Sequence, residues 1–434
     1  MLRSVATSWT LFFGLLLIMA GNGLQVVLLG VRSTEAGFTN IETGVIMAGY
    51  YLGMFFGSTL VPTMLSNVGH VRVFGAMSAI ASAAVLVHAL VLDPIVWTVM
   101  RIMTGLSFAG MFIVCESWLN DKSTNKTRGQ MLSLYMIVTM AGIAAGQMMI
   151  SFDDGNGLSL FLLASVLVSI AVVPILITEG NAPEFSAPER MSVRRLYHIS
   201  PLAVIGLIIN GMAISMLFGM GAVYARSTGL TPTEVGYFLT APVLGALFLQ
   251  YPVGRLSDRF DRRIVILGVA ATAALVLGCA WQFGSLHFLV LLGCMFLFGG
   301  LLFPMYSLCI AHANDFLTPS QMVAVASGLI MMSGAGAVTG SPMAALSLEY
   351  LGTASFFPLL ATTQIVTALI VVVRMTARPS VPGAAQGPFV AIPEASTAMA
   401  ASLNPETEWV DTDPAGDDAD DPFKDNPYID RKGH

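Results

Sequence analysis

Charged side chains are scarce in this sequence. They make up 11% of its 434 residues, against roughly 25% in an ordinary soluble domain. So few charges cannot cover the surface of a water-soluble protein of this length. The abundant apolar residues fall instead in long blocks, such as residues 9–29 and 161–177, close to the roughly 20 residues that cross the hydrocarbon core of a bilayer. The sequence therefore predicts an all-α membrane protein.

Cysteine is equally sparse, and its placement argues against two kinds of site. All four cysteines lie inside apolar blocks, away from clusters of His or Asp, so neither a disulfide framework nor a metal site is expected. Metal-spaced His and Asp sets, nucleophile constellations and phosphate-binding loops are also missing. We therefore expect no enzymatic activity, no cofactor, no metal and no nucleic-acid partner.

The apolar blocks divide into two sets of six, and a polar stretch separates the sets. The last part of the chain is rich in Pro, Ala, Ser, Asp and Glu without long apolar runs, which predicts a disordered acidic tail. We expect a six-helix half at 1–178, a cytoplasmic linker at 179–199, a second half at 200–375 and the tail at 376–434. The predicted spans lie near 8–30, 43–65, 72–92, 95–118, 130–152, 158–178, 200–224, 233–254, 264–282, 286–309, 320–341 and 350–374.

Basic residues indicate the orientation, because short loops rich in Lys and Arg stay in the cytoplasm. If the N-terminus is inside, the outer loops hold only Arg32 and Arg226, and Arg101 lies within a span. Every other Lys and Arg then falls on the inner side. Both termini are therefore expected in the cytoplasm.

The two halves share an internal pattern. A single offset aligns Cys115 with Cys309 and Gly105 with Gly299, and each cysteine is followed at the same spacing by Asn-Asp. Helices four and ten of a parallel repeat would correspond in this way. The pattern favours two pseudo-symmetric six-helix bundles.

Several motifs resemble those of a known family. The loop between spans eight and nine reads Gly254-Arg-Leu-Ser-Asp258-Arg259-Phe-Asp261-Arg262-Arg263. It resembles the G-x-L-x-D-R-x-G-R-R signature of the major facilitator superfamily, with Asp261 in place of the second glycine. The Arg101-x-x-x-Gly105 pattern of helix four looks like another motif of that superfamily, and Glu116-Ser-Trp-Leu-Asn-Asp is similar to its YcaD-like branch. The resemblance implies a twelve-helix permease of the bacterial inner membrane, which is a secondary active transporter with rocking halves.

The motif after span eight predicts a gate. Asp258 could cap the start of a helix or pair with a neighbouring arginine, which would form a cytoplasmic latch that breaks when the halves rock. We expect Gly254, Asp258, Arg259 and Arg262 to act in this gate, although a generic basic turn is an alternative. In the first half Ser66 stands where the aspartate belongs, so an acidic latch residue is missing there.

Polar residues at mid-depth predict the substrate site. A charge within the hydrocarbon region should face the bundle interior or a wet cavity, although Arg101 could instead extend to the outer interface. The amides could form a central site or hydrogen bonds between helices. The scarcity of charge favours a neutral, zwitterionic or amphiphilic solute, with Arg101 leaving room for one carboxylate. The candidate substrate-binding residues are Asn22, Gln25, Arg101, Tyr135, Gln147 and Asn210.

Glu116 is the candidate for proton coupling. An isolated carboxylate is disfavoured in a low-dielectric cavity, so Glu116 should take up and release a proton during the cycle. Its position near the inner end of its helix also fits a solvated cap or a carboxylate bonded to the cytoplasmic latch. Helix five lacks the G-x-x-x-G-P pattern of antiporters, because Gln147 follows Gly146, which argues against drug-proton antiport. The transport mode that we expect is symport.

The tail leaves a second function open. The expected partners are a small solute, protons and membrane lipid. A transporter-derived sensor or scaffold would instead signal through the acidic tail to a protein partner.

Overall fold

The computed structural model describes residues 2–124, 127–153, 158–176, 191–377, 386–394, 396–405 and 407. Within these residues, 12 helices are long and apolar enough to cross a membrane, as predicted. The remaining secondary structure of the described chain is also helical. The predicted all-α membrane fold is therefore confirmed.

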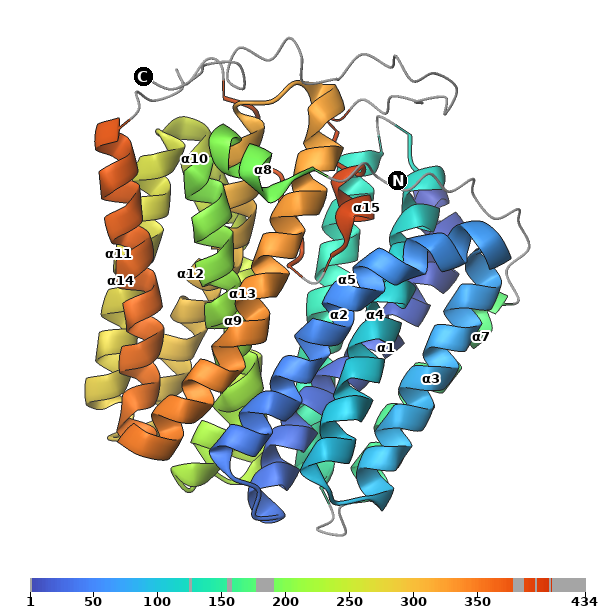
Figure 1. Ribbon diagram of the computed structural model, residues 1–434, viewed down its shortest axis with the longest axis vertical. Coiled ribbons are helices and arrows are strands. Elements are labelled where there is room, and N and C mark those ends of the chain that lie inside the picture. The colour runs from blue at the N-terminus through green and yellow to red at the C-terminus, as the bar shows by residue number, and fades with distance from the viewer. Residues whose placement is uncertain are drawn as a thin grey trace.

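The first half contains six of the spans (blue to green in Figure 1). Its fifth span ends in a 3-10 turn, and its sixth span is divided into two helical pieces. The elements are α1 (Leu2–Glu35), α2 (Asn40–Val68), α3 (His70–Leu90), α4 (Pro94–Asp121), α5 (Arg128–Met148), η1 (Met149–Phe152), α6 (Ser159–Ile170) and α7 (Val173–Leu176).

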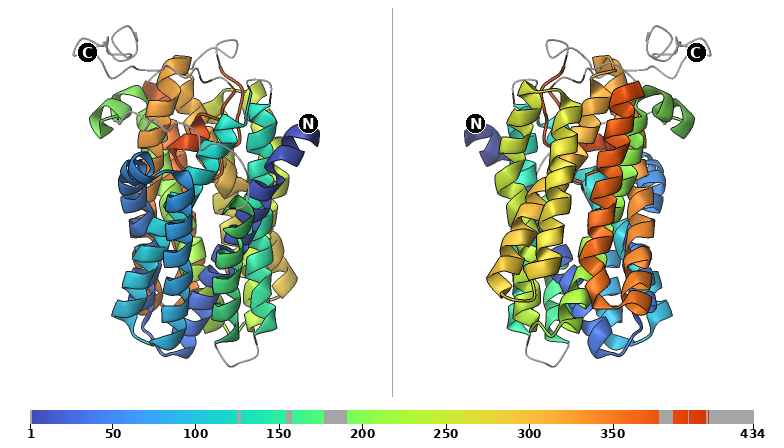
Figure 2. Two further views of the ribbon diagram at one scale, coloured as in Figure 1. Left: turned by 90° about the vertical axis from the view of Figure 1, so that its right-hand side faces the viewer. Right: turned by 90° about the vertical axis from the view of Figure 1, so that its left-hand side faces the viewer.

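The second half contains the other six spans, and Figure 2 shows the two halves from opposite sides. One short helix precedes this half within the predicted linker, and another follows it within the predicted tail. The elements are α8 (Val193–Ile199), α9 (Pro201–Ser227), α10 (Pro232–Arg259), α11 (Arg262–Phe283), α12 (Phe288–Asn314), η2 (Pro319–Gln321), α13 (Met322–Leu351), η3 (Thr353–Ser355), α14 (Phe356–Ala377) and α15 (Ala398–Ala401).

The second span of each half begins with the same cap. Thr39 caps α2 and Thr231 caps α10, and each threonine exchanges hydrogen bonds with a glutamate three residues later, Glu42 or Glu234. Such a capping box satisfies backbone N–H groups that the first helical turn leaves free. The shared cap gives the internal repeat a structural counterpart.

Glycines bring the second and fourth spans of each half into close contact. A Cβ atom on Gly105 of α4 would lie 1.9 Å from the carbonyl oxygen of Tyr50 in α2. In the second half, a Cβ on Gly299 of α12 would lie 2.1 Å from the carbonyl oxygen of Pro242 in α10. Close backbone approach at small residues is the usual way for helices to pack where lipid removes the hydrophobic drive. These two glycines were aligned by the repeat in the sequence.

Most of the described basic residues outside the membrane interior gather at one face, where α1 begins, α14 ends, and α8 and α15 lie (upper side of Figure 1). We call it the basic face, and it is the predicted cytoplasmic face. Arg32 and Arg226 lie at the opposite face, near the ends of α1 and α9. The basic face includes Arg72, Arg128, Arg194, Arg195, Arg255, Arg259, Arg263 and Arg374.

The two halves touch near the opposite face. The Nη2 atom of Arg226 lies 3.4 Å from Oε1 of Glu35, and the side-chain amide of Asn40 donates to Glu349 over 2.9 Å. A Cβ on Gly44 of α2 would lie 2.4 Å from the Cβ of Ala345 in α13. Toward the basic face the inner parts of α2 and α13 instead border a cavity. The halves are therefore closed at one face only.

The tail differs from its predicted disorder. Residues 386–394, 396–405 and 407, here called the tail segment, run between the halves from the basic face (red in Figure 1). Ile392 is 4% exposed and Leu403 is 0% exposed. The apolar stretches of this segment are too short to span a membrane, but they are long enough to fill a space between helices that already exists. The prediction of disorder for the rest of 378–434 lies outside the described residues.

Candidate functional site

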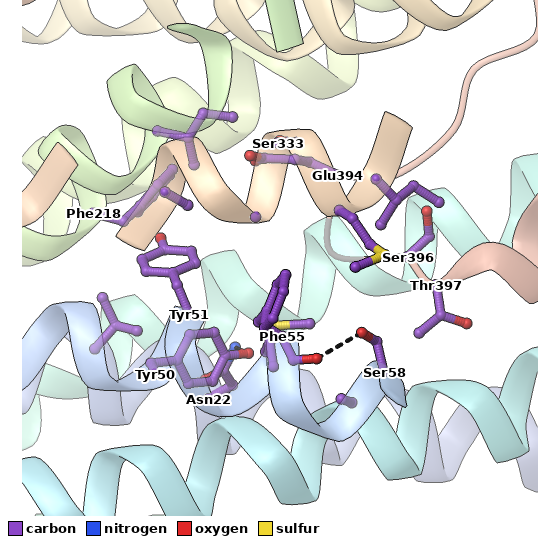
Figure 3. A pocket seen from close by; sticks show the side chains of 18 of the residues that line it. Asn22, Tyr50, Tyr51, Phe55, Ser58, Phe218, Ser333, Glu394, Ser396 and Thr397 are labelled. Atoms are coloured by element: carbon purple, nitrogen blue, oxygen red, sulfur yellow. Dashed lines mark hydrogen bonds between the residues drawn. The ribbon is translucent and has the colours of Figure 1, made fainter. Parts of the chain in front are cut away.

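A cavity of about 220 Å³ lies between the halves. Helices α1, α2, α4 and α5 line it from the first half, α9, α12 and α13 line it from the second, and the tail segment completes it (Figure 3). Its walls are mostly apolar, with Met47, Phe218 and Phe303 among them. An apolar cavity with a few convergent polar groups is typical of a site for a small organic molecule.

Arg101 provides a positive charge in this cavity. Its side chain is 2% exposed, and its guanidinium carbon lies 4.6 Å from the centre of the Tyr50 ring. Asn22 donates to the hydroxyl of Tyr50 over 3.4 Å. The predicted substrate-binding residues Asn22 and Arg101 therefore lie close together, joined through a tyrosine of α2. The ring face stabilises the buried cation, but it leaves the N–H donors of the guanidinium available.

Three of the polar side chains that line the cavity retain unused hydrogen-bonding atoms. Among the described residues, none bonds to Nε or Nη1 of Arg101, to the side-chain oxygen of Asn22, or to either polar atom of the Gln147 amide. Gln147 is 1% exposed. Buried polar groups normally have partners, so these atoms mark a place where a polar ligand could bind.

The other three predicted substrate-binding residues lie elsewhere. Gln25 and Asn210 are buried, but they are not among the described residues that line the cavity. Tyr135 is also buried outside this lining, where its hydroxyl donates to Glu116 over 2.7 Å. The structure therefore brings Asn22, Arg101 and Gln147 together without these three residues.

Glu116, the predicted coupling residue, is 0% exposed. Its carboxylate accepts hydrogen bonds from the Tyr135 hydroxyl and from both the backbone N–H and the hydroxyl of Thr397. The Thr397 nitrogen lies 3.0 Å from each carboxylate oxygen. The alternative of a solvated helix cap is therefore wrong, because the side chain is enclosed by α5 and the tail segment.

The signature loop of the second half contacts the tail segment. Asp258 lies near the end of α10, where its carboxylate accepts from the backbone N–H of Phe389 over 2.7 Å. A Cβ on Gly254 would lie 2.4 Å from the Phe389 ring. The expectation that Asp258 could cap a helix start is wrong, since Asp261 caps α11 and pairs with Arg263 at 3.0 Å. The aspartate that replaces the motif's second glycine has taken the capping position.

Arg262 connects the same loop to α12. Its Nε atom lies 3.3 Å from Oδ2 of Asp315, and both side chains are almost fully buried. The guanidinium also donates to the carbonyl oxygen of Gly387, and the N–H of Gly387 donates to Asp315 over 3.2 Å. Arg259 is exposed. Of the four predicted gating residues, Gly254, Asp258 and Arg262 therefore meet the tail segment.

The sequence did not identify the second-half residues that hold the middle of the tail segment. Ser307 of α12 accepts from the N–H of Ile392 over 3.0 Å and donates to its carbonyl oxygen over 3.2 Å. Gln250 donates to Ser307 over 3.3 Å. Glu394 follows in a turn and lines the cavity (Figure 3). The short apolar stretches around Ile392 and Met399 were the only signal for this contact.

Comparison with known proteins agrees with this architecture. The family model of the Major Facilitator Superfamily matches residues 11–202 and 203–406. The MFS-type transporters Ent638_1421 of Enterobacter sp. (strain 638) and YcaD of Escherichia fergusonii are 24% and 22% identical to the chain, and each match covers 85% of this chain and 96% of the relative. A crystal structure of a mutant of the nucleoside transporter NupG has a TM-score of 0.73 at 12% identity, and the match covers 85% of this chain and 99% of that one. The chain is therefore a member of the Major Facilitator Superfamily, and it transports a solute.

Proposed function

We propose that the protein is a secondary active transporter that moves a small organic solute across the cytoplasmic membrane of a bacterial cell. The observation that carries the proposal is the cavity between the halves, with Arg101 in its wall and the Nε and Nη1 atoms of that guanidinium without hydrogen-bond partners among the described residues. The cavity lies where two rocking halves could expose it to either side in turn. Membership of a transporter superfamily supports the same reading.

The contacts between the halves suit alternating access. The closed opposite face relies on small side chains and surface polar pairs, such as Gly44 against Ala345 and Arg226 with Glu35. Exposed ion pairs contribute only about 0–1 kcal/mol each, so they can break and re-form during a cycle. We assign the structure to the state that faces the basic side, which we take to be the cytoplasm.

The chemistry of the cavity supports a solute with an apolar body and one negative charge. A buried cation is costly without a counter-charge, and no described carboxylate pairs with Arg101. A carboxylate on the solute could accept from the free Nε and Nη1 donors of Arg101. Asn22 and Gln147 have amide atoms available for one further polar group. NupG, which shares the fold, is named as a nucleoside transporter, and this supports a metabolite-sized solute.

Proton coupling is proposed for Glu116. The carboxylate accepts hydrogen bonds from the Tyr135 hydroxyl and from the backbone N–H and hydroxyl of Thr397. A protonated carboxyl group must donate a hydrogen bond as well as accept them. Binding of a proton would therefore rearrange the contacts between α4, α5 and the tail segment, which supplies a physical link between protonation and conformation.

The test uses organic acids and their uncharged amide analogues. Purified full-length protein is screened by thermal shift at two pH values, and any acid that stabilises it is followed into vesicles under an imposed proton gradient. Acids should stabilise the protein and amides should not. Arg101→Gln should lose the response, whereas Arg255→Gln, which removes an exposed arginine of the basic face, should keep it. Equal stabilisation by acids and amides would contradict the proposed solute class.

Glu116→Gln tests coupling separately. This variant should still bind the acid, but it should no longer accumulate it against a gradient when driven by protons. Accumulation that persists at the rate of the unmodified protein, with the same pH dependence, would show that the coupling assignment is wrong.

A sensor or scaffold is the second candidate, and the docked tail segment favours it. A chain that ends after Ala377 distinguishes the two functions. A transporter shortened in this way keeps the helices that line the cavity and should carry the solute. A sensor should transport nothing in either its full-length or its shortened form.

A further inference from the structure

The tail segment contacts both halves at the face where they are otherwise apart. We propose that it is a built-in inhibitory ligand of the transport cavity, which blocks the cycle while docked and must withdraw before solute can pass. The inference rests on the proposed function because the site that it regulates is the proposed transport cavity.

The second half holds the entering arm of the segment. Asp258 binds the N–H of Phe389, and Ser307 binds both backbone groups of Ile392. Arg262 donates to the carbonyl oxygen of Gly387. These bonds go mainly to the backbone of the tail, so they fix its path along α10 and α12. They also occupy two of the residues that were predicted to gate the cavity.

The first half holds the returning arm. Thr397 donates through its N–H and its hydroxyl to Glu116, and Arg128 lies 3.5 Å from the carbonyl oxygen of Thr407. A single stretch of chain therefore connects the signature loop of the second half to the proposed coupling residue of the first. While it is docked, the segment covers the Glu116 carboxylate, which is 0% exposed.

Burial indicates that the segment forms part of the wall of the cavity. Ile392, Met399 and Leu403 are 4%, 5% and 0% exposed. Glu394, Ser396 and Thr397 line the cavity, and Figure 3 shows them on the side where α13 and the first-half helices are separated. In Figure 1 the helical turn α15 lies between α13 and the helices of the first half. Solute that approaches from the basic face must displace this wall.

Rocking makes the docked segment incompatible with transport. To open the opposite face, the halves must approach each other at the basic face. The tail segment occupies the space into which α2 and α13 would move, and it bonds to both halves. The docked state therefore cannot proceed to the next conformation of the cycle.

Thiol accessibility tests the proposal without any known solute. Ser58 of α2 lines the cavity, and Ser58→Cys is made with Cys279→Ser and Cys294→Ser, which remove the thiols that are not fully buried. Labelling by N-ethylmaleimide is followed by mass spectrometry of the peptide that contains position 58. The rate is compared between the full chain, a chain that ends after Ala377 and a Leu403→Asp variant.

Leu403→Asp places a charge at a buried position of the tail alone, so it should release the segment without disturbing the spans. We expect labelling to be about tenfold faster, or more, in this variant and in the shortened chain, because each removes the state in which the tail segment is docked. Pro388→Asp, which adds the same charge at an exposed position of the segment, should label like the full chain. A synthetic peptide of residues 386–407 should slow labelling of the shortened chain, and the same peptide with Leu403→Asp should not.

The outcomes separate this inference from the proposed function. Equal labelling in the full and shortened chains, with both monodisperse and equally heat-stable, would overturn the inference even if vesicles transport solute. Faster labelling without uptake by any form would refute the proposed function and leave the docking intact. If both proposals hold, the shortened chain and Leu403→Asp should take up the solute faster than the full chain does.

Discussion

Docking of the tail segment buries the carboxyl group of Glu394, and this burial opposes docking. Its carboxyl group lies in the cavity wall, facing Tyr50, Tyr51 and Tyr306, and burial raises its pKa well above the ordinary value of 4.5. The structure gives it no basic partner among the described side chains. A carboxylate in such surroundings favours the neutral form, so docking requires the uptake of a proton when Glu394 starts out ionised.

Docking should therefore depend on pH. Because the pKa is higher in the docked state, docking is strongest below about 4.5 and weakens as the pH rises toward the docked pKa. The ratio of labelling rates between the full and shortened chains, measured across pH with the thiol at position 58, reports this change. In a Glu116→Gln background, which removes the carboxyl group that binds Thr397, Glu394→Gln should reduce the slope and dock more tightly at neutral pH. An unchanged slope in Glu394→Gln would contradict this account.

Tyr50 should contribute to stability mainly through its ring. Tyr50→Phe removes only a long hydrogen bond from Asn22, while Tyr50→Leu also removes the aromatic face beneath Arg101. A desolvated cation–π contact contributes about 2 kcal/mol. Thermal unfolding in detergent should therefore show a clearly lower midpoint for Tyr50→Leu than for Tyr50→Phe. Equal midpoints would mean that the ring does not stabilise the buried guanidinium.

At the level of elements, the spans were predictable because lipid imposes a simple rule. A backbone in hydrocarbon must satisfy its own hydrogen bonds, so long apolar blocks become helices. The faces of those helices were much harder to predict. Both the lipid-facing and the core-facing sides of a membrane bundle are apolar, so periodicity did not reveal that Asn22 lines the cavity while Gln25, one turn later on α1, does not. For the same reason, Asn210 could not be separated from Gln147 by sequence.

The tail segment escaped prediction for a different physical reason. The stretches around Ile392 and Met399 are too short and too small to fold independently, and their neighbours are polar. They become buried only because two helical halves already frame a cavity of the right width. A contact of this kind depends on the tertiary structure, and a criterion based on the length of apolar runs does not detect it.

Packing of α2 against α4 should be sensitive to one methyl group. Gly105→Ala would place a Cβ 1.9 Å from the carbonyl oxygen of Tyr50, and the overlap should cost about 1–3 kcal/mol. Gly75→Ala is the matched control, because nothing lies within 4 Å of its Cβ position in α3. Gly105→Ala should lower the thermal midpoint in detergent while Gly75→Ala leaves it unchanged or raises it. Equal effects would mean that close packing at Gly105 is not required.

At the scale of the whole molecule, the two halves touch each other at one face and are separated by the tail segment at the other. The closed face depends on close approach of α2 and α13 at Gly44. The filled face depends on Glu116 in one half and on Asp258 and Ser307 in the other. The equilibrium between conformations should therefore respond to substitutions at either face.

Enlarging Gly44 should open the closed face. A valine there would overlap the Cβ of Ala345, which lies 2.4 Å from the first added carbon. A cost of about 1–3 kcal/mol would shift the conformational ratio by roughly 5- to 150-fold. Spin labels at Ala36 and Tyr350, near the opposite face, should show a population at longer distance. Gly268→Val, at an open position on α11, should leave the distance distribution unchanged. Identical distributions for both variants would show that Gly44 does not control closure.

The covalent attachment of the tail segment has a consequence for the cell. A tethered ligand acts at an effective concentration set by its linker, on the order of millimolar for a short flexible connection. The fraction of molecules with a docked tail segment is therefore the same whether the membrane holds few or many copies of the protein. A free competitor of equal affinity for the docking site would have to reach a comparable concentration in the cytoplasm to displace the segment. A protein that binds the released tail could instead capture it whenever the segment undocks spontaneously, and would prevent it from docking again.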